Sequence, residues 1–308
     1  MPAFDLCSTV FIIRPHSHFT PQQFLGRMAH KLFLSMLDHI GLEALANSLH
    51  NKSDHLPYVV SDIFPNGTHH FWLRISGLTP HISQDVIAKL ATLVGQTIEV
   101  KARNDREEAP WKCVVDAVVP SQHEWARSQT YSEFVHTAWR LSRPKYFRLE
   151  FITPTAIKSE GLYRPFPMPH WVFRPLYDRF SRLGGTSLPF QPNSIYLEAY
   201  AEHFIRVEDY GMRCRKRLPM KDDKLVAFQG WIDYTLSEPN EHFGVGDHAD
   251  KKLYRTEPVS TIRAHIQQHR DQYAALVHLL AQFAYYSGVG KYTGQGMGMV
   301  QLSERTGR

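Results

Sequence analysis

The sequence predicts an α+β fold in which strands and helices follow one another in the order βαββαβ twice. Three observations support this prediction. Short β-branched segments alternate with longer segments of helical periodicity, the same order of segments occurs in each half of the chain, and 308 residues are enough for two domains. The expected architecture is two tandem ferredoxin-like domains, inferred from element order because the halves share no obvious sequence repeat.

The first half opens with a strand and two helices. Residues 9–13 are β-branched and apolar and are followed by Arg-Pro, which is typical of a short buried strand. Thr20 and Pro21 provide an N-cap and a first helical residue, and apolar residues at helical spacing continue to Ile40. A shorter helix is expected over residues 42–49.

The rest of the first half supplies the remaining elements of one βαββαβ unit. Apolar and β-branched segments predict strands over residues 56–60, 70–75, 97–101 and 112–118, and a helix over residues 82–94. A Pro-Asn-Gly turn joins the first two of these strands.

The second half repeats this order. Residues 146–152 alternate with a period of two, as a half-buried strand does, and a helix follows around residues 171–176. The later segments predict strands over residues 195–207, 225–236 and 297–302, and one long helix over residues 261–286. We therefore expect an N-terminal domain over residues 1–120, a linker over residues 121–145 with one short helix near residues 133–141, and a C-terminal domain over residues 146–308.

The composition favours a globular protein with a polyanionic partner. The net charge is +5 and the isoelectric point is about 9.0. The three cysteines lie far apart without metal-ligand spacing, and an odd count fits a reducing compartment. No segment has the apolar length of a membrane span or the form of a signal peptide. We expect a soluble, cytoplasmic protein with no cofactor, no metal and no membrane contact.

The most distinctive stretch covers residues 287–300. Its five glycines are Gly288, Gly290, Gly294, Gly296 and Gly298, and Lys291 lies among them. Glycine at this density lets the backbone take positive φ and approach a phosphate closely. The stretch is not a P-loop, because Tyr285 stands where that motif requires its first glycine. On its own, a glycine-rich turn between a helix and a last strand is the simplest interpretation.

Two further groups are candidates for binding. The densest basic cluster lies between two predicted strands. Its members are Arg213, Arg215, Lys216 and Arg217. Most such runs are solvated loops, and phosphate contact is the alternative. His265 and His269 have the spacing of zinc ligands on a helix, but no third ligand accompanies them, so we interpret them as surface histidines.

His50 stands at the end of the short helix predicted over residues 42–49, two positions before Lys52. From the residues alone, the simplest interpretation is a histidine that interacts with the negative end of the helix dipole. A single lysine in a loop is most often solvated.

Three segments together resemble one family. Residues 288–298 read Gly-x-Gly-Lys-x-Thr-Gly-x-Gly-Met-Gly and resemble the C-terminal glycine-rich loop of the CRISPR-associated repeat-cleaving endoribonucleases, within the superfamily of repeat-associated RNA-binding proteins. Residues 49–61 are similar to a family segment of leucine-histidine, a polar loop, proline-aromatic and a strand ending in serine. Residues 146–176, with Thr-Pro-Thr, a proline-rich turn and a Val-Phe-Arg helix, resemble the segment that opens the family's second domain.

The resemblance implies a metal-independent endoribonuclease that cleaves CRISPR precursor RNA within its repeats and so releases guide RNAs. In this chemistry a ribose 2′-hydroxyl attacks the phosphate and leaves a 2′,3′-cyclic phosphate and a 5′-hydroxyl. His50 matches the family's catalytic histidine and would act as acid or base, and Lys52 would stabilise charge on the phosphate. His30 and His55 are the next candidates. The glycine-rich stretch with Lys291, and the basic cluster, would bind the RNA.

A second function is that of a non-catalytic subunit of the same superfamily, which holds guide RNA within a CRISPR effector complex. The case for catalysis depends mainly on His50. An unrelated RNA-modifying enzyme would need a cofactor site, which the sequence does not indicate. In the first two cases the expected partner is CRISPR repeat RNA, as precursor and as mature guide RNA.

Overall fold

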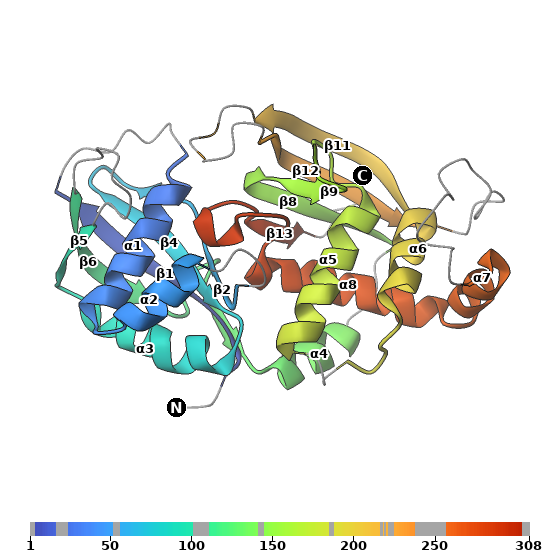
Figure 1. Ribbon diagram of the computed structural model, residues 1–308, viewed down its shortest axis with the longest axis horizontal. Helices are drawn as coiled ribbons and strands as arrows, with labels where there is room; N and C mark the ends of the chain where they lie inside the picture. Colours follow the sequence, from blue (N-terminus) through green and yellow to red (C-terminus); the bar gives the residue numbers. More distant parts are fainter. Residues whose placement is uncertain are drawn as a thin grey trace.

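Two large antiparallel β-sheets lie side by side in the part of the chain that the computed structural model describes (Figure 1). The structure describes residues 4–16, 24–51, 56–100, 111–140, 145–184, 188–215, 218, 220, 225–237 and 257–303. Several predicted positions lie outside these ranges, namely Thr20, Pro21, Lys52, His55, Lys216 and Arg217.

The first sheet has the strand order β2-β4-β1-β6-β5, with β3 paired to β4 and β7 paired to β1. Its strands are β1 (Leu6–Pro15), β2 (Tyr58–Val60), β3 (Phe64–Asn66), β4 (His70–Gly77), β5 (Thr97–Val100), β6 (Trp111–Val119) and β7 (Arg127–Gln129). Its helical elements are α1 (Gly26–His39), α2 (Glu43–Asn51), the π-helical turn η1 (His81–Val86), α3 (Ile87–Leu90) and the 3-10 turn η2 (Ala91–Leu93). The apolar face of α1 is fully buried at Leu32, Phe33 and Met36, in one cluster with the sheet residues Phe11 and Leu73.

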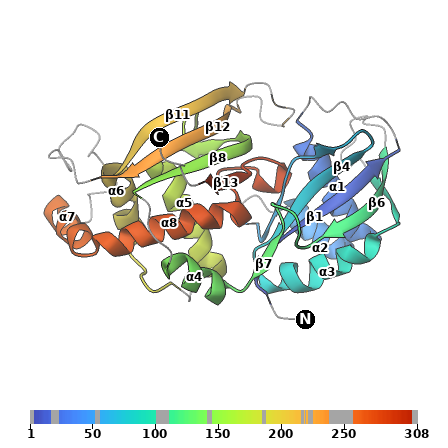
Figure 2. The ribbon, with the colours of Figure 1, turned by 180° about the vertical axis from the view of Figure 1, so that it is seen from behind.

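The second sheet has the order β11-β12-β8-β13. Its strands are β8 (Tyr146–Thr155), β11 (Ile205–Arg215), β12 (Ala227–Leu236) and β13 (Val300–Ser303), and β9 (Ile157–Ser159) and β10 (Leu162–Arg164) form a separate hairpin. The helical elements of this part are α4 (Tyr131–Arg140), α5 (Pro169–Gly184), α6 (Ser194–Phe204), α7 (Val259–Gln268), α8 (Arg270–Ser287) and the 3-10 turn η3 (Thr293–Gln295). In the view from behind in Figure 2, α8 runs alongside the strands of this sheet, and α5 and α6 lie on the same side of the sheet as α8.

This architecture confirms the predicted α+β class and the tandem ferredoxin-like arrangement. In each large sheet, the first strand of the βαββαβ unit lies at the centre, between the third and the last. The segment expected as a linker contains β7, which pairs with β1, and α4, which contacts α8. The domain boundaries themselves stay predictions.

The prediction of a strand over residues 195–207 is wrong for most of this segment. Helix α6 ends at Phe204, and β11 begins at Ile205. The Asn193 side chain accepts a hydrogen bond from the backbone N–H of Ile195 at 3.0 Å, which caps the helix. The segment is so rich in apolar and aromatic residues that its pattern does not separate a buried helix from a strand.

The prediction of a single long helix over residues 261–286 is also wrong, because this segment forms two helices, α7 and α8. The chain leaves helical geometry at His269, where φ is −111° and ψ is 21°, and this residue ends α7 and precedes α8.

The apolar core of the second sheet continues into the first. Leu6, Val10 and Leu78, from the first sheet and its flank, belong to the same buried cluster as the residues of α5 and α8. Arg74 of β4 is fully buried at this junction and donates a hydrogen bond from Nη1 to the backbone oxygen of Tyr285 at 2.7 Å. Its guanidinium lies 5.2 Å from the ring centre of Trp125, and burial lowers its pKa to about 10.

A second arginine, Arg179 of α5, connects the two sheets through backbone oxygens. Its Nη1 donates to the oxygen of Ser287 at the end of α8 (2.5 Å), and its Nη2 donates to the oxygen of Leu56 just before β2 (2.9 Å). Nη1 also lies 3.2 Å from Oγ1 of Thr293. Burial lowers the pKa of this guanidinium to about 10. One side chain thus holds segments that are far apart in the sequence.

We expect Arg179→Ala to lower the melting temperature clearly more than Arg182→Ala. Both residues lie on α5, but Arg182 is exposed, whereas removal of Arg179 leaves several carbonyls without their donor. Each buried acceptor that loses its partner costs about 1–3 kcal/mol. Differential scanning fluorimetry of both variants measures the difference, and equal melting temperatures would show that Arg179 does not hold the two sheets together.

Candidate functional site

Two histidines lie together where α1 and α2 pack against each other. His50 is in the last turn of α2 and is exposed, whereas His30 of α1 is only 9% exposed. Their rings are stacked, with 6.1 Å between centroids and 20° between planes. The packing of the two helices therefore places an accessible imidazole in front of a nearly buried one.

Tyr58 of β2 forms the third member of this group. Its ring is parallel to that of His30 within 6°, with 6.4 Å between centroids, and Phe33 packs against it at 4.8 Å. The tyrosine is fully buried, and its hydroxyl has no hydrogen-bond partner among the described residues. Burial raises the pKa of Tyr58 well above its ordinary value, so the phenol is a neutral donor at physiological pH. We call His30, His50 and Tyr58 the histidine group.

The glycine-rich loop, residues 288–298, packs beside the histidine group. The backbone N–H of Gly296 donates to the oxygen of Val60 in β2 at 3.0 Å. A Cβ on Gly294 would lie 2.7 Å from Cδ1 of Leu56 and 3.3 Å from the Tyr58 hydroxyl. This loop of the second half therefore reaches the strand that carries Tyr58.

Glycine is required at Gly296 for two reasons. Its φ is +84°, in the left-handed region, and a Cβ there would lie 2.3 Å from the Cα of Gly26 at the start of α1. In return, a Cβ on Gly26 would lie 2.2 Å from the backbone oxygen of Gln295. The two backbones are thus in direct contact, which fixes the loop against the helix that carries His30.

Asp62 also stabilises the start of α1. Its Oδ1 accepts hydrogen bonds from the backbone N–H groups of Leu25 at 2.7 Å and Ile63 at 2.9 Å, so it satisfies a donor at the start of α1. Burial raises the pKa of Asp62 to about 7, despite these two bonds. The start of α1 is therefore held by a carboxyl group that is costly to keep charged.

The predicted RNA-binding residues lie in two neighbouring places. Lys291 is exposed in the glycine-rich loop, and its backbone N–H donates to the oxygen of Ala156 at 2.8 Å. Arg213 and Arg215 are exposed near the end of β11, and Nε of Arg215 donates to Oε1 of Gln229 at 3.0 Å. Leu218 and Met220, just beyond the basic cluster, pack on the same small apolar cluster as Tyr292 of the loop. The structure therefore brings the base of the basic cluster close to the glycine-rich loop.

The histidine group contains one residue that the sequence ranked low and one that it missed. By sequence, His30 is only one of the next candidates after His50, and Tyr58 is only part of a predicted strand. The single available signal is that His30 and His50 both lie on predicted helices, but their proximity depends on how α1 and α2 pack.

The other histidine pair forms no metal site among the described residues. The rings of His265 and His269 lie 4.6 Å apart, but no group of three or more His, Cys, Asp or Glu side chains that could hold a metal occurs in that part of the chain. Likewise, none of the described helices is long and apolar enough to cross a membrane.

We expect Gly296→Ala to destabilise the protein much more than Gly67→Ala. Both glycines have similar positive φ (+84° and +79°), so both variants pay about 1–2 kcal/mol of backbone strain. Only Gly296 has a backbone neighbour in the way, whereas nothing lies within 4 Å of a Cβ on Gly67. Thermal denaturation of the two variants measures the excess, and similar losses would mean that the loop moves away from α1 without cost.

The chain is similar to known proteins of one family. Residues 149–300, which include most of the second sheet and the glycine-rich loop, match the family described as CRISPR-associated endoribonuclease Cas6. A CRISPR-associated endoribonuclease Cas6 of Streptococcus thermophilus is 27% identical over 165 residues, which are 52% of this chain. The match spans 51% of that relative, so about half of its length.

Solved structures of similar fold extend over nearly the whole chain. A Cas6 product complex has a TM-score of 0.66 at 21% identity and covers 97% of this chain and 99% of its own. Cas6 of Thermus thermophilus has a TM-score of 0.63 at 18% identity, with coverage of 98% and 100%. At these identities the likeness concerns the fold.

Proposed function

We propose that this chain is an endoribonuclease of the Cas6 family, which its second half matches and whose solved structures share its fold, and that it cleaves CRISPR precursor RNA within the repeats to release guide RNAs. The observation that carries the proposal is the contact between the glycine-rich loop and the histidine group. A loop suited to RNA and a pair of imidazoles suited to proton transfer lie next to each other.

The proposed reaction is attack by the ribose 2′-hydroxyl on the adjacent phosphate. The 2′-oxygen loses its proton and forms a bond to phosphorus, and the 5′-oxygen of the next nucleotide leaves and takes up a proton. The products are a 2′,3′-cyclic phosphate and a 5′-hydroxyl. This chemistry needs one proton acceptor and one proton donor, which suits imidazoles because they exist in both forms near neutral pH.

His50 is the member of the histidine group that an RNA can reach. It is exposed, while His30 is nearly buried behind it and Tyr58 is fully buried. We therefore assign proton transfer to His50, and to His30 and Tyr58 the role of holding its ring and the neighbouring loop in place. Lys52, two residues further along the chain, would stabilise the charge that develops on the phosphate.

The RNA contacts follow from the neighbouring surfaces. We propose that the glycine-rich loop with Lys291 lies against the RNA near the cleavage point. The basic cluster, with Arg213 and Arg215 exposed, would contact phosphates further away. The second candidate function is a subunit that binds guide RNA in a CRISPR effector complex without cleaving it. The absence of any cleavage by the wild type would favour this second function.

We expect the wild type to cleave repeat RNA at one position in the presence of EDTA. We also expect it to leave the same RNA uncut when the nucleotide before that position carries a 2′-deoxyribose, because the attacking oxygen is then missing. Binding of the deoxy RNA should stay close to that of the ribose form, since one hydroxyl is a small part of the contact. Gel analysis with mass spectrometry of the product ends identifies the cyclic phosphate. Cleavage of the deoxy RNA would exclude 2′-hydroxyl attack.

We expect His50→Ala to lower the single-turnover cleavage rate by about 10²–10⁴-fold, which is the usual contribution of a general acid or base. Affinity for repeat RNA and the melting temperature should change little, because His50 is exposed. A role limited to the helix dipole would instead cost about 0.3–1 kcal/mol of stability and spare the rate.

The matched control is His39→Ala, which removes an exposed histidine from the last turn of α1. Its cleavage rate should equal that of the wild type. If His50→Ala cleaves within a few-fold of the wild type, the assignment is wrong and His30 and His55 become the next residues to change.

A further inference from the structure

A pair of tyrosines lies at the glycine-rich loop and is not part of the histidine group. Tyr163 belongs to the β9–β10 hairpin, and Tyr292 belongs to the loop. Their hydroxyl oxygens are 3.2 Å apart, and both side chains are half-buried. The hairpin follows directly on β8 and has no part in the mechanism proposed above.

The backbone holds this pair in a defined geometry. Tyr292 has φ 62° and ψ 26°, a left-handed conformation that is uncommon for a residue other than glycine. The backbone N–H of its neighbour Lys291 donates a hydrogen bond to the oxygen of Ala156. A Cβ on Gly290 would lie 2.4 Å from that same Ala156 oxygen. The loop is therefore pinned to the start of the hairpin, and the strain at Tyr292 is retained by these contacts.

Two exposed lysines flank the tyrosines. Nζ of Lys158 lies 5.2 Å from the ring centre of Tyr163, and Lys291 directly precedes Tyr292. On the protein side, both tyrosines pack on a small apolar cluster that includes Met297. Each tyrosine ring thus packs on the protein interior, and a positively charged side chain lies beside it at the surface.

We propose that Tyr163, Tyr292, Lys158 and Lys291 form a binding site for single-stranded RNA. A nucleobase stacks on the tyrosine pair, and the lysines contact the flanking phosphates. Aromatic rings interleaved with cations are the usual platform for single strands, because every base has a face that can stack. The choice of RNA as ligand rests on the proposed function.

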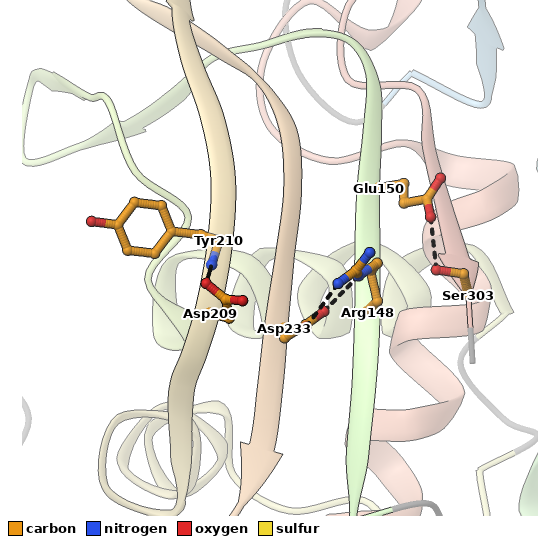
Figure 3. A network of polar contacts seen from close by, with 6 residues as sticks. All are labelled: Arg148, Glu150, Asp209, Tyr210, Asp233 and Ser303. Carbon is orange, nitrogen blue, oxygen red and sulfur yellow. Dashed lines mark hydrogen bonds and ion pairs between the residues drawn. The ribbon is translucent and has the colours of Figure 1, made fainter. Parts of the chain in front are cut away.

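The open face of the second sheet is the competing platform, and its charges argue against it. Figure 3 shows Arg148 bonded through two nitrogens to Asp233. The Arg148 guanidinium also lies 3.8 Å from the ring centre of Trp231. This arginine is already neutralised by a buried carboxylate, and Glu150 and Asp209 add further negative charge on the same sheet (Figure 3). Phosphates are therefore better placed at the tyrosine pair.

The tyrosine site continues the candidate catalytic site. From Tyr292 the loop passes through Thr293 to Gly294, which abuts Tyr58 of the histidine group. An RNA strand that occupied both sites would contact the histidine group at one end and the tyrosines at the other. The site therefore positions the strand and sets affinity, and it does not take part in bond breaking.

The test measures binding of a short fluorescein-labelled single-stranded RNA of mixed sequence by fluorescence anisotropy. We expect Tyr163→Ala to weaken binding by about 5- to 150-fold, the range found when one stacking ring is removed. Tyr163→Phe keeps the ring and should bind within about twofold of the wild type, which also shows that the hairpin still folds. Lys158→Ala should reduce the log–log salt slope by about 0.7.

The matched control is Tyr146→Ala. Tyr146 is an exposed tyrosine with a lysine, Lys145, 5.7 Å from its ring centre, but it lies at the start of β8, away from the loop. Its loss should leave binding unchanged. If Tyr163→Ala binds within twofold of the wild type, or if Tyr146→Ala weakens binding equally, the inference is overturned.

Cleavage of repeat RNA by the wild type, run in parallel, separates this inference from the proposed function. Platform-dependent binding without any cleavage would support the tyrosine site and overturn the endoribonuclease. Cleavage by the wild type, together with unchanged binding by Tyr163→Ala, would do the opposite. A wild type that neither binds nor cleaves RNA would overturn both.

Discussion

The arrangement of the site depends on one contact between two backbones, that of Gly26 at the start of α1 and that of Gly296 in the glycine-rich loop. Neither position has room for a Cβ, because each faces main-chain atoms of the other segment within 3 Å. His30 lies one turn further along α1. The contact therefore sets the distance between the loop and the histidine that stands behind His50.

Buried polar groups maintain this contact at some cost. Burial raises the pKa of Asp62 to about 7, yet its carboxyl group accepts hydrogen bonds from the backbone N–H of Leu25, just before α1, and from that of Ile63. Burial lowers the pKa of Arg179 and of Arg74. Both guanidinium groups donate hydrogen bonds to backbone carbonyl groups that would otherwise be buried without a donor. Arg179 and Arg74 favour one relative position of the two sheets, because their hydrogen bonds to carbonyl groups across the junction form only there.

The sequence predicted those features that depend on local pattern. The order of strands, the helix that ends near His50 and the glycine-rich turn all follow from periodicity and composition, and the family resemblance drew attention to His50 and to the loop. The pattern failed at Ile195, because an apolar stretch with an N-cap at Asn193 fits a buried helix as well as a strand. The stacking of His30 on Tyr58 and the role of Gly26 could not be predicted, since they depend on how distant segments pack.

The position of the loop also determines when the site can exist during synthesis of the protein. The hydrogen bond between Arg74 and Tyr285 joins residues 211 positions apart, and the Gly26–Gly296 contact is longer still in sequence. The helices that carry His30 and His50 leave the ribosome long before the loop that completes their surroundings. A nascent chain therefore carries the histidines without the glycine-rich loop beside them until residues 288–298 have emerged, so this group of contacts forms only late in synthesis.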